Sequence, residues 1–168
     1  MNIPHIVWAL LLLAAAAGLV SGVFLTFSDF VMKSLAASRP AAGTEAMQII
    51  NRKVFRSIFM VLLLGMIPVS ILTAIVGYFF HDGTLSVLLV SAGLLYFFGV
   101  FFVSAIGNIP MNNTLEALPQ GGVEAQIYWP DYVREWVLWN HVRWLAALGV
   151  SVCYMVSAVL MAQAACSR

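Results

Sequence analysis

The chain has 168 residues, of which 62% are hydrophobic and only 9% are charged. A soluble domain would carry about 25% charged residues, so this composition excludes an ordinary soluble protein and predicts an integral membrane protein. The length suits one domain that covers residues 1–168. The formal net charge of +1 gives no electrostatic reason to expect nucleic acid as a partner.

The first membrane span is predicted at about residues 5–28. Uncharged sequence runs from Ile3 to Ser28 and exceeds the ~20 residues that cross a bilayer. No basic segment precedes it, and it is too long for the apolar part of a signal peptide. We therefore expect the protein to retain this segment as a membrane helix.

Asp29, directly after this span, has two interpretations. Lys33 follows four residues later, which favours an exposed ion pair at the membrane interface. A carboxylate is costly in hydrocarbon, so the alternative is that Asp29 faces the bundle at the mouth of a cavity. The sequence leaves both interpretations open.

The second span is predicted at about residues 57–80, within a longer helix. Residues 33–43 are predicted as a loop, because Arg39-Pro40 and the following Ala-Ala-Gly interrupt the pattern. Thr44 is the expected N-cap of a helix that runs to about residue 80, with a kink at Pro68.

The third span is predicted at about residues 85–107. The segment before it, His81-Asp82-Gly83-Thr84, is typical of a tight turn. A connection this short predicts that the second and third spans form an antiparallel helical hairpin.

Two pairs of carboxamides lie near the ends of these spans. Gln48 and Asn51 continue onto the face of their helix that becomes apolar, so we expect both to point inward. Asn108 and Asn112 flank Pro110, and they share a face if the helix continues past the proline. Either these asparagines satisfy a broken helix end, or they form a set of amide donors at the mouth of a cavity.

The last helix is predicted from about Asp131 to Met161, with Pro130 near its first position. Its membrane span covers about residues 144–164. Residues 114–129 before it are expected to hold only a short amphipathic piece and a loop.

The most informative pattern lies where this last helix begins. Trp136, Trp139, Asn140 and Arg143 fall at i, i+3, i+4 and i+7, so a helix brings them to one face. This face carries two indoles, a carboxamide and a guanidinium next to apolar sequence. These groups need hydrogen-bonding partners, which the polar residues at the other helix ends can supply.

The basic residues predict the orientation of the chain. Seven lie in the two segments between spans one and two and between spans three and four: Lys33, Arg39, Arg52, Lys53, Arg56, Arg134 and Arg143. Only Arg168 lies on the other side. The positive-inside rule then puts both segments in the cytoplasm and both termini outside it, as expected for a protein of the bacterial inner membrane.

These elements predict an all-α, antiparallel four-helix bundle in which helices 2 and 4 extend beyond the membrane on the cytoplasmic side. All four polar clusters then meet at that end: Ser28-Asp29, Gln48/Asn51, Asn108/Asn112 and Asn140/Arg143. They form either a polar pocket above an apolar core or a polar plug that satisfies helix ends and fixes the register of the bundle. The sequence leaves both open.

Four stretches carry a resemblance to a known family. They are Phe27-Ser28-Asp29-Phe30-Val31-Met32, Ala46-Met47-Gln48-Ile49-Ile50-Asn51-Arg52, Gly107-Asn108-Ile109-Pro110-Met111-Asn112 and Trp136-Val137-Leu138-Trp139-Asn140-His141-Val142-Arg143. With the spans between them, the chain resembles the anthrone oxygenase-like integral membrane proteins over nearly its whole length. The resemblance implies a four-helix membrane protein. The family's characterised fungal members oxidise anthrones to anthraquinones with dioxygen and without an added cofactor.

The first functional hypothesis is an oxygenase that acts on a hydrophobic polycyclic or quinol-type aromatic. Such a reaction needs a base, a group that stabilises the resulting anion and a dry pocket that admits dioxygen. The candidate catalytic residues are Asp29 or His141 as the base and Arg143 for the anion. The candidate substrate-binding residues are Gln48, Asn51, Asn108, Asn112, Trp136, Trp139 and Asn140.

The second hypothesis is a non-enzymatic protein, either a small membrane subunit or a binder of lipid or quinone. The polar layer is then structural, and Asp29 pairs with Arg143 or Lys33. Transport has less support, because no span centre carries a charge.

The expected partners are membrane lipid and a hydrophobic small molecule, and the sequence leaves open a homo-oligomer or a larger membrane complex. The resemblance implies that no cofactor is added. We expect no metal or haem site, because His5, His81 and His141 are scattered over both sides of the membrane. Cys153 and Cys166 lie roughly 20 Å apart at ~1.5 Å per helical residue, too far for a disulfide.

Overall fold

The computed structural model describes residues 3–166, and every regular element in that range is helical. In chain order the elements are α1 (Ile3–Thr26), η1 (Phe27–Val31), α2 (Met32–Ala37), α3 (Pro40–Val54), α4 (Ile58–Phe80), α5 (Gly83–Leu94), η2 (Leu95–Phe102), η3 (Ser104–Asn108), α6 (Ile109–Ala117) and α7 (Val123–Cys166). The three η segments are wider π-helical turns inside continuous helices.

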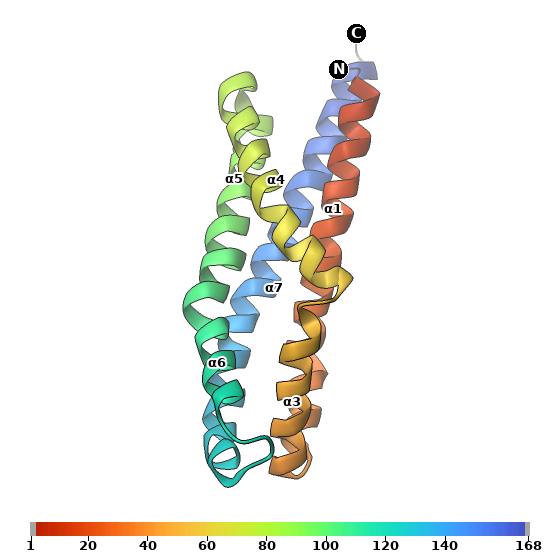
Figure 1. Cartoon of the computed structure of the whole chain (residues 1–168). Coiled ribbons are helices and arrows are strands. Elements are labelled where there is room, and N and C mark those ends of the chain that lie inside the picture. The colour runs from red at the N-terminus through yellow and green to blue at the C-terminus, as the bar shows by residue number, and fades with distance from the viewer. Residues whose placement is uncertain (1–2, 167–168) are drawn as a thin grey trace.

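Four helical runs are long and apolar enough to cross a membrane: His5–Ala37, Ile58–Phe80, Gly83–Ala117 and Val123–Cys166. They form an antiparallel bundle in which the start of α1 and the end of α7 lie side by side at one end (Figure 1). The expected all-α membrane bundle of four helices is therefore confirmed.

The helices divide the bundle into two halves. In one half, α1 packs along α7, and α4 and α5 form a hairpin whose turn uses Gly83 at a φ of 61°. In the other half, α2, α3 and α6 surround the first part of α7 (Figure 1). With 44 residues, α7 is about 66 Å long at ~1.5 Å per residue, roughly twice the ~30 Å hydrocarbon thickness. The length of α7 therefore exceeds the thickness of one hydrocarbon layer.

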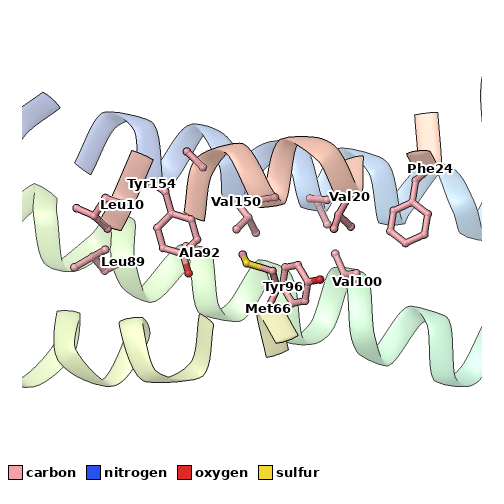
Figure 2. Packing of buried hydrophobic residues seen from close by; sticks show 14 of the residues in the cluster. Leu10, Val20, Phe24, Met66, Leu89, Ala92, Tyr96, Val100, Val150 and Tyr154 are labelled. Carbon is pink, nitrogen blue, oxygen red and sulfur yellow. The ribbon is translucent and has the colours of Figure 1, made fainter. Parts of the chain in front are cut away.

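The first half encloses the larger apolar core. Figure 2 shows Val20 of α1 and Val150 of α7 pointing toward Tyr96 and Val100 of η2, with Phe24 at the end of the row. The Phe24 ring also packs edge-on against Phe59 of α4, with ring centroids 5.4 Å apart. Because this core ends at Phe24, the two halves of the bundle meet there.

The second predicted helix is broken in the structure, so the expectation of one helix from Thr44 to Phe80 is wrong. Residues 55–57 separate α3 from α4, and the Ser57 hydroxyl accepts a hydrogen bond from the Met60 amide and caps α4. The break lets α4 cross from α1 toward α5 instead of continuing along the axis of α3 (Figure 1).

Two other helix starts were predicted too late. α3 begins at Pro40, whose fixed φ suits a first helical position, and Thr44 lies inside the helix with its hydroxyl bonded to the Pro40 and Ala41 carbonyls. α7 begins at Val123 and passes through Pro130. Consequently the expected loop at 33–43 shrinks to residues 38–39, because α2 continues to Ala37.

Candidate functional site

A cavity of about 540 Å³ lies where the two halves of the bundle meet. Its wall is largely apolar and includes Phe24, Phe27, Phe59, Leu63, Ile67, Tyr96, Val100 and Trp136. Its polar wall comprises Ser104, Asn108, Asn112, Asn113 and Glu116 on the third run, Asn51 and Arg52 on α3, and Arg143 on α7. The break between α3 and α4 helps to create this space, because α4 leaves the axis of α3.

All three π-helical turns in residues 3–166 contribute to the wall of this cavity. η1 contributes Phe27, η2 contributes Tyr96 and Val100, and η3 contributes Ser104 and Asn108. π-helical turns are rare and are frequently found at functional sites, because they redirect side chains out of the regular helical pattern. Their convergence here supports the cavity as the functional centre.

Arg143 is the charged group deepest in this cavity. Its guanidinium lies 4.3 Å from the centroid of the Phe24 ring and 5.2 Å from that of Trp136, and the residue is only 7% exposed. Nη2 donates to Asn140 Oδ1 at 2.6 Å, and Nη1 lies 3.5 Å from Ser104 Oγ. The two rings and these two polar partners hold the guanidinium in place.

Within residues 3–166, the charge of Arg143 has no carboxylate partner. The ion pairs within residues 3–166 join Lys33 to Asp29, Arg52 to Glu116, and Arg134 to Asp131 and Glu135. In addition, Nε of Arg143 is buried without a hydrogen-bond partner. A buried cation that is neither paired nor fully hydrogen-bonded is costly, and an anion in the cavity would compensate it.

Asn140 positions Arg143 and does not line the cavity. It is fully buried, and its Nδ2 donates to the Phe24 carbonyl at 2.6 Å and to Ser28 Oγ at 2.7 Å. Its Oδ1 accepts the bond from Arg143. The expected meeting of Ser28 with the face of α7 therefore occurs, and Asn140 ties the first helical run to the cation.

The two asparagines of the third run share a face, because the helix continues past Pro110. Asn108 is fully buried and donates through Nδ2 to the Trp136 carbonyl at 3.0 Å, while its Oδ1 has no partner. Asn112 Oδ1 accepts from the Tyr132 hydroxyl at 2.8 Å and from Trp136 Nε1 at 2.9 Å. Both side chains line the cavity while they bind α7.

The two carboxamides of α3 have different surroundings. Asn51 lines the cavity, and its buried Nδ2 faces the Tyr132 hydroxyl without a close hydrogen bond. Gln48 lies away from the cavity and donates to the carbonyls of Leu115 and Leu118 at 2.8 and 3.1 Å. These carbonyls end α6, so Gln48 satisfies a helix end.

Both candidate bases, Asp29 and His141, lie outside the cavity. Asp29 is exposed and lies 3.9 Å from Lys33, as in the interfacial interpretation. His141 is exposed, and its Nδ1 accepts from Trp144 Nε1 at 3.2 Å. Both lie at a shallow surface depression between the first run and α7, which is separate from the cavity.

Trp139 also turns away, so the expected common face holds only Trp136, Asn140 and Arg143. Trp139 is 37% exposed, and its ring lies over Gly107. A Cβ added at Gly107 would lie 2.6 Å from atoms of that ring. Each residue of an α-helix rotates by about 100° around the helix axis. Trp139, three residues after Trp136, therefore falls at the edge of the buried face.

Several cavity residues were not singled out from the sequence. Ser104 and Glu116 continue the spacing of Asn108 and Asn112 at intervals of four residues, a signal that was visible in the sequence. The apolar residues Phe24 and Phe59 gave no such signal, because they resemble any core residue of a membrane helix.

Chemically, the cavity offers the ion-paired Arg52, the buried guanidinium of Arg143, amide groups and aromatic surface. Among the residues of the cavity wall, the buried atoms without a close hydrogen-bond partner are the donors Arg143 Nε and Asn51 Nδ2 and the acceptor Asn108 Oδ1. Within residues 3–166, no group of three or more His, Cys, Asp or Glu side chains is placed to hold a metal ion.

Fold and site together define a helical membrane protein with a large apolar cavity that is cationic at its inner end. The family model described as anthrone oxygenase matches residues 52–153, which is more than half of the chain. The chain therefore belongs to the anthrone oxygenase family. The matched range contains Asn108, Asn112 and Arg143. It begins one residue after Asn51 and does not include the first helical run. No curated protein and no solved structure matches the chain.

Proposed function

We propose that this protein is a membrane-embedded oxygenase that oxidises a hydrophobic polycyclic or quinol-type aromatic with dioxygen. The observation that carries the proposal is Arg143, a buried cation in an apolar cavity that has no carboxylate partner among the described residues 3–166. A phenolate or enolate in that cavity would supply the missing negative charge. Family membership supports the same reaction class.

For an anthrone-like substrate the reaction balances without a further reductant. The substrate loses a proton to give a stabilised carbanion, which transfers its electrons to dioxygen and forms a C–O bond. The resulting peroxide takes up a proton and loses water, and the ring carbon becomes a carbonyl. Each turnover consumes one dioxygen and releases one water.

The cavity contributes to this reaction mainly by electrostatics. The fixed charge of Arg143 stabilises the substrate anion in a site of low polarity, where such an interaction is stronger than in water. A nearby cation also lowers the pKa of an acidic substrate. Asn51 Nδ2 is a second donor for the oxyanion, and Trp136 offers a ring face for stacking.

Neither Asp29 nor His141 lines the cavity, so neither contacts a substrate bound there. Substrate ionisation by Arg143, with the proton leaving through the mouth of the cavity, fits this geometry better than direct proton transfer to either residue.

The orientation inferred from the basic residues is part of the proposal. Arg39, Arg52, Lys53 and Arg134 lie in the half of the bundle formed by α2, α3, α6 and the first part of α7. This distribution supports a cytoplasmic location for that half in a bacterial inner membrane, with the start of α1 and the end of α7 outside.

The test is oxygen uptake with a simple anthrone by protein purified in mild detergent, with the anthraquinone absorption as a second readout. Replacement of Arg143 by Ala should abolish turnover without unfolding the protein. The matched control is Arg134→Ala, an exposed arginine on the same helix. Undiminished turnover by Arg143→Ala would refute the role of the cation.

A second candidate is a binding protein for a lipid or quinone, which one observation favours. The interior wall of the cavity has neither a carboxylate nor an imidazole, and Glu116 at the mouth is already paired with Arg52. In that case a quinone or lipid should copurify and appear in native mass spectra, and no anthrone oxidation should occur.

A further inference from the structure

We propose that ligands dissolved in the bilayer enter the cavity sideways, between α4 and η2, and that the Arg52–Glu116 ion pair closes the polar end of this entrance. This inference rests on the proposed function only in taking the same cavity as the ligand site. It concerns binding and does not depend on turnover.

The exposed residues of the cavity wall lie on two facing sides. On one side are α3 and the start of α4, and on the other are η2, η3 and α6. The exposed members are Arg52, Phe55, Leu64, Phe101, Ile109, Asn113 and Glu116. The cavity therefore opens between these two sides, and we call this opening the lateral mouth.

The lateral mouth is apolar along most of its length. Phe55, Leu64, Phe101 and Ile109 are large hydrophobic residues that are 39–71% exposed. Leu64 lies within α4 and Phe101 within the third run, both of which are apolar enough to cross a membrane. This part of the mouth consequently faces the acyl chains of the bilayer rather than water.

One end of the lateral mouth is polar and is bridged by an ion pair. Arg52 Nη1 of α3 donates to Glu116 Oε1 of α6 at 2.6 Å. The pair joins the two sides of the mouth, and the side chains are 45% and 38% exposed. It thereby limits the access of water to the cavity from the polar end.

The position of Glu116 argues for this role over a catalytic one. Ser104, which contacts Arg143, precedes Glu116 by twelve residues, or roughly 18 Å at ~1.5 Å per helical residue. A base must lie within about 3 Å of the proton that it removes. A ring system of three fused rings held at Arg143 would not bring its acidic carbon to Glu116.

Ligands that fit this entrance share a simple chemistry. They partition into the acyl region, because the mouth is apolar there, and they carry an oxygen on one edge of an aromatic ring for Arg143. A soluble metabolite would have to pass the Arg52–Glu116 pair instead.

The experiment measures loading in lipid vesicles without oxygen, so that no turnover occurs. Anthrone is mixed with phosphatidylcholine vesicles that contain the full chain, and binding is followed through quenching of tryptophan fluorescence, to which Trp136 in the cavity wall contributes. Anthrone is compared with alkyl-substituted anthrones that partition more strongly into the bilayer, all at the same free aqueous concentration. Loading from the bilayer predicts a rate that rises with the partition coefficient, whereas loading from water predicts equal rates and would overturn the proposal.

Two pairs of variants locate the entrance. Leu64→Cys and Leu72→Cys, each in a Cys153→Ser, Cys166→Ser background, are labelled with a bulky maleimide. Both leucines are exposed on α4, at 54% and 59%, but only Leu64 lines the cavity. Labelling at Leu64 should slow loading several-fold and labelling at Leu72 should not; equal effects would refute the lateral mouth.

Glu116→Gln tests the ion pair, with the exposed Glu124→Gln as its control. Loss of this partly exposed pair should speed loading by up to about fivefold, and an unchanged rate would remove the pair from the proposal. Anthrone binding without oxygen uptake in air would refute the oxygenase function alone. Absence of binding in every protein would refute the lateral mouth as well.

Discussion

The guanidinium of Arg143 lies 4.3 Å from the centroid of the Phe24 ring, although these residues belong to opposite ends of the sequence. A cation over an aromatic face is stabilised by the negative potential of the ring, but this does not neutralise its charge. Asn140 bonds to both partners, through the Phe24 carbonyl and Arg143 Nη2. This contact joins the apolar core of the bundle to the cationic end of the cavity, and the predictions below start from it.

Replacement of Arg143 by Met keeps the length of the side chain and removes its charge. If the cation serves a ligand, binding of an anionic aromatic should weaken at least about tenfold. Stability should stay within about 1 kcal/mol of the wild type or rise, because a buried unpaired charge is removed. Thermal unfolding in detergent and ligand titration measure the two effects.

Arg134→Met is the control for this variant, because Arg134 is exposed and paired with surface carboxylates. If Arg143→Met unfolded the protein while Arg134→Met did not, the polar layer would be a structural plug rather than a ligand site.

Asn140→Ala should destabilise the protein by about 2–4 kcal/mol, because it leaves a buried carbonyl and a buried guanidinium without their partner. Its exposed neighbour His141 should tolerate Ala within about 0.5 kcal/mol. The comparison of their midpoints of thermal unfolding checks this difference. Equal midpoints would mean that Asn140 does not hold the two helices together.

Asp29→Asn and His141→Ala should leave anthrone binding and oxygen uptake close to those of the wild type. Both residues lie outside the cavity, and the exposed Asp29–Lys33 pair contributes at most about 1 kcal/mol to stability. Steady-state oxygen uptake at several anthrone concentrations is the measurement. A large fall in kcat with unchanged binding, in either variant, would restore that residue as the base.

Gly93→Ala should separate α4 from α5. An added Cβ would lie 2.5 Å from the Ala74 Cβ and 2.8 Å from the Ser70 carbonyl oxygen, and a backbone atom cannot move aside as a side chain can. We expect a loss of about 1–3 kcal/mol, measured by thermal unfolding in detergent.

The matched control for Gly93→Ala is Gly65→Ala on α4, where no heavy atom lies within 4 Å of the added Cβ. Alanine there should be neutral or stabilising by about 0.5–1 kcal/mol, since it reduces the freedom of the unfolded chain. Equal effects of the two changes would argue against close packing at Gly93.

The sequence by itself determined the membrane class, the number of spans and the polar character of one bundle end. Long apolar segments have few alternatives to helices in a bilayer, because every backbone amide needs an internal partner. Helical spacing alone also brought Trp136, Asn140 and Arg143 to one face, and put Asn108 and Asn112 on another. These features depend on local geometry, so they follow from the order of residues.

Only the tertiary structure decided which of these polar groups meet. The sequence left two interpretations of Asp29 open. In the structure the helix presents Ser28, and not Asp29, to Asn140. Asp29 therefore stays exposed beside Lys33. The break at residues 55–57 tilts α4 and helps to open the cavity, and no propensity of Phe55 or Arg56 required it. The cavity is a space between helices distant in sequence, and such a space depends on how whole helices pack rather than on the spacing within any one of them.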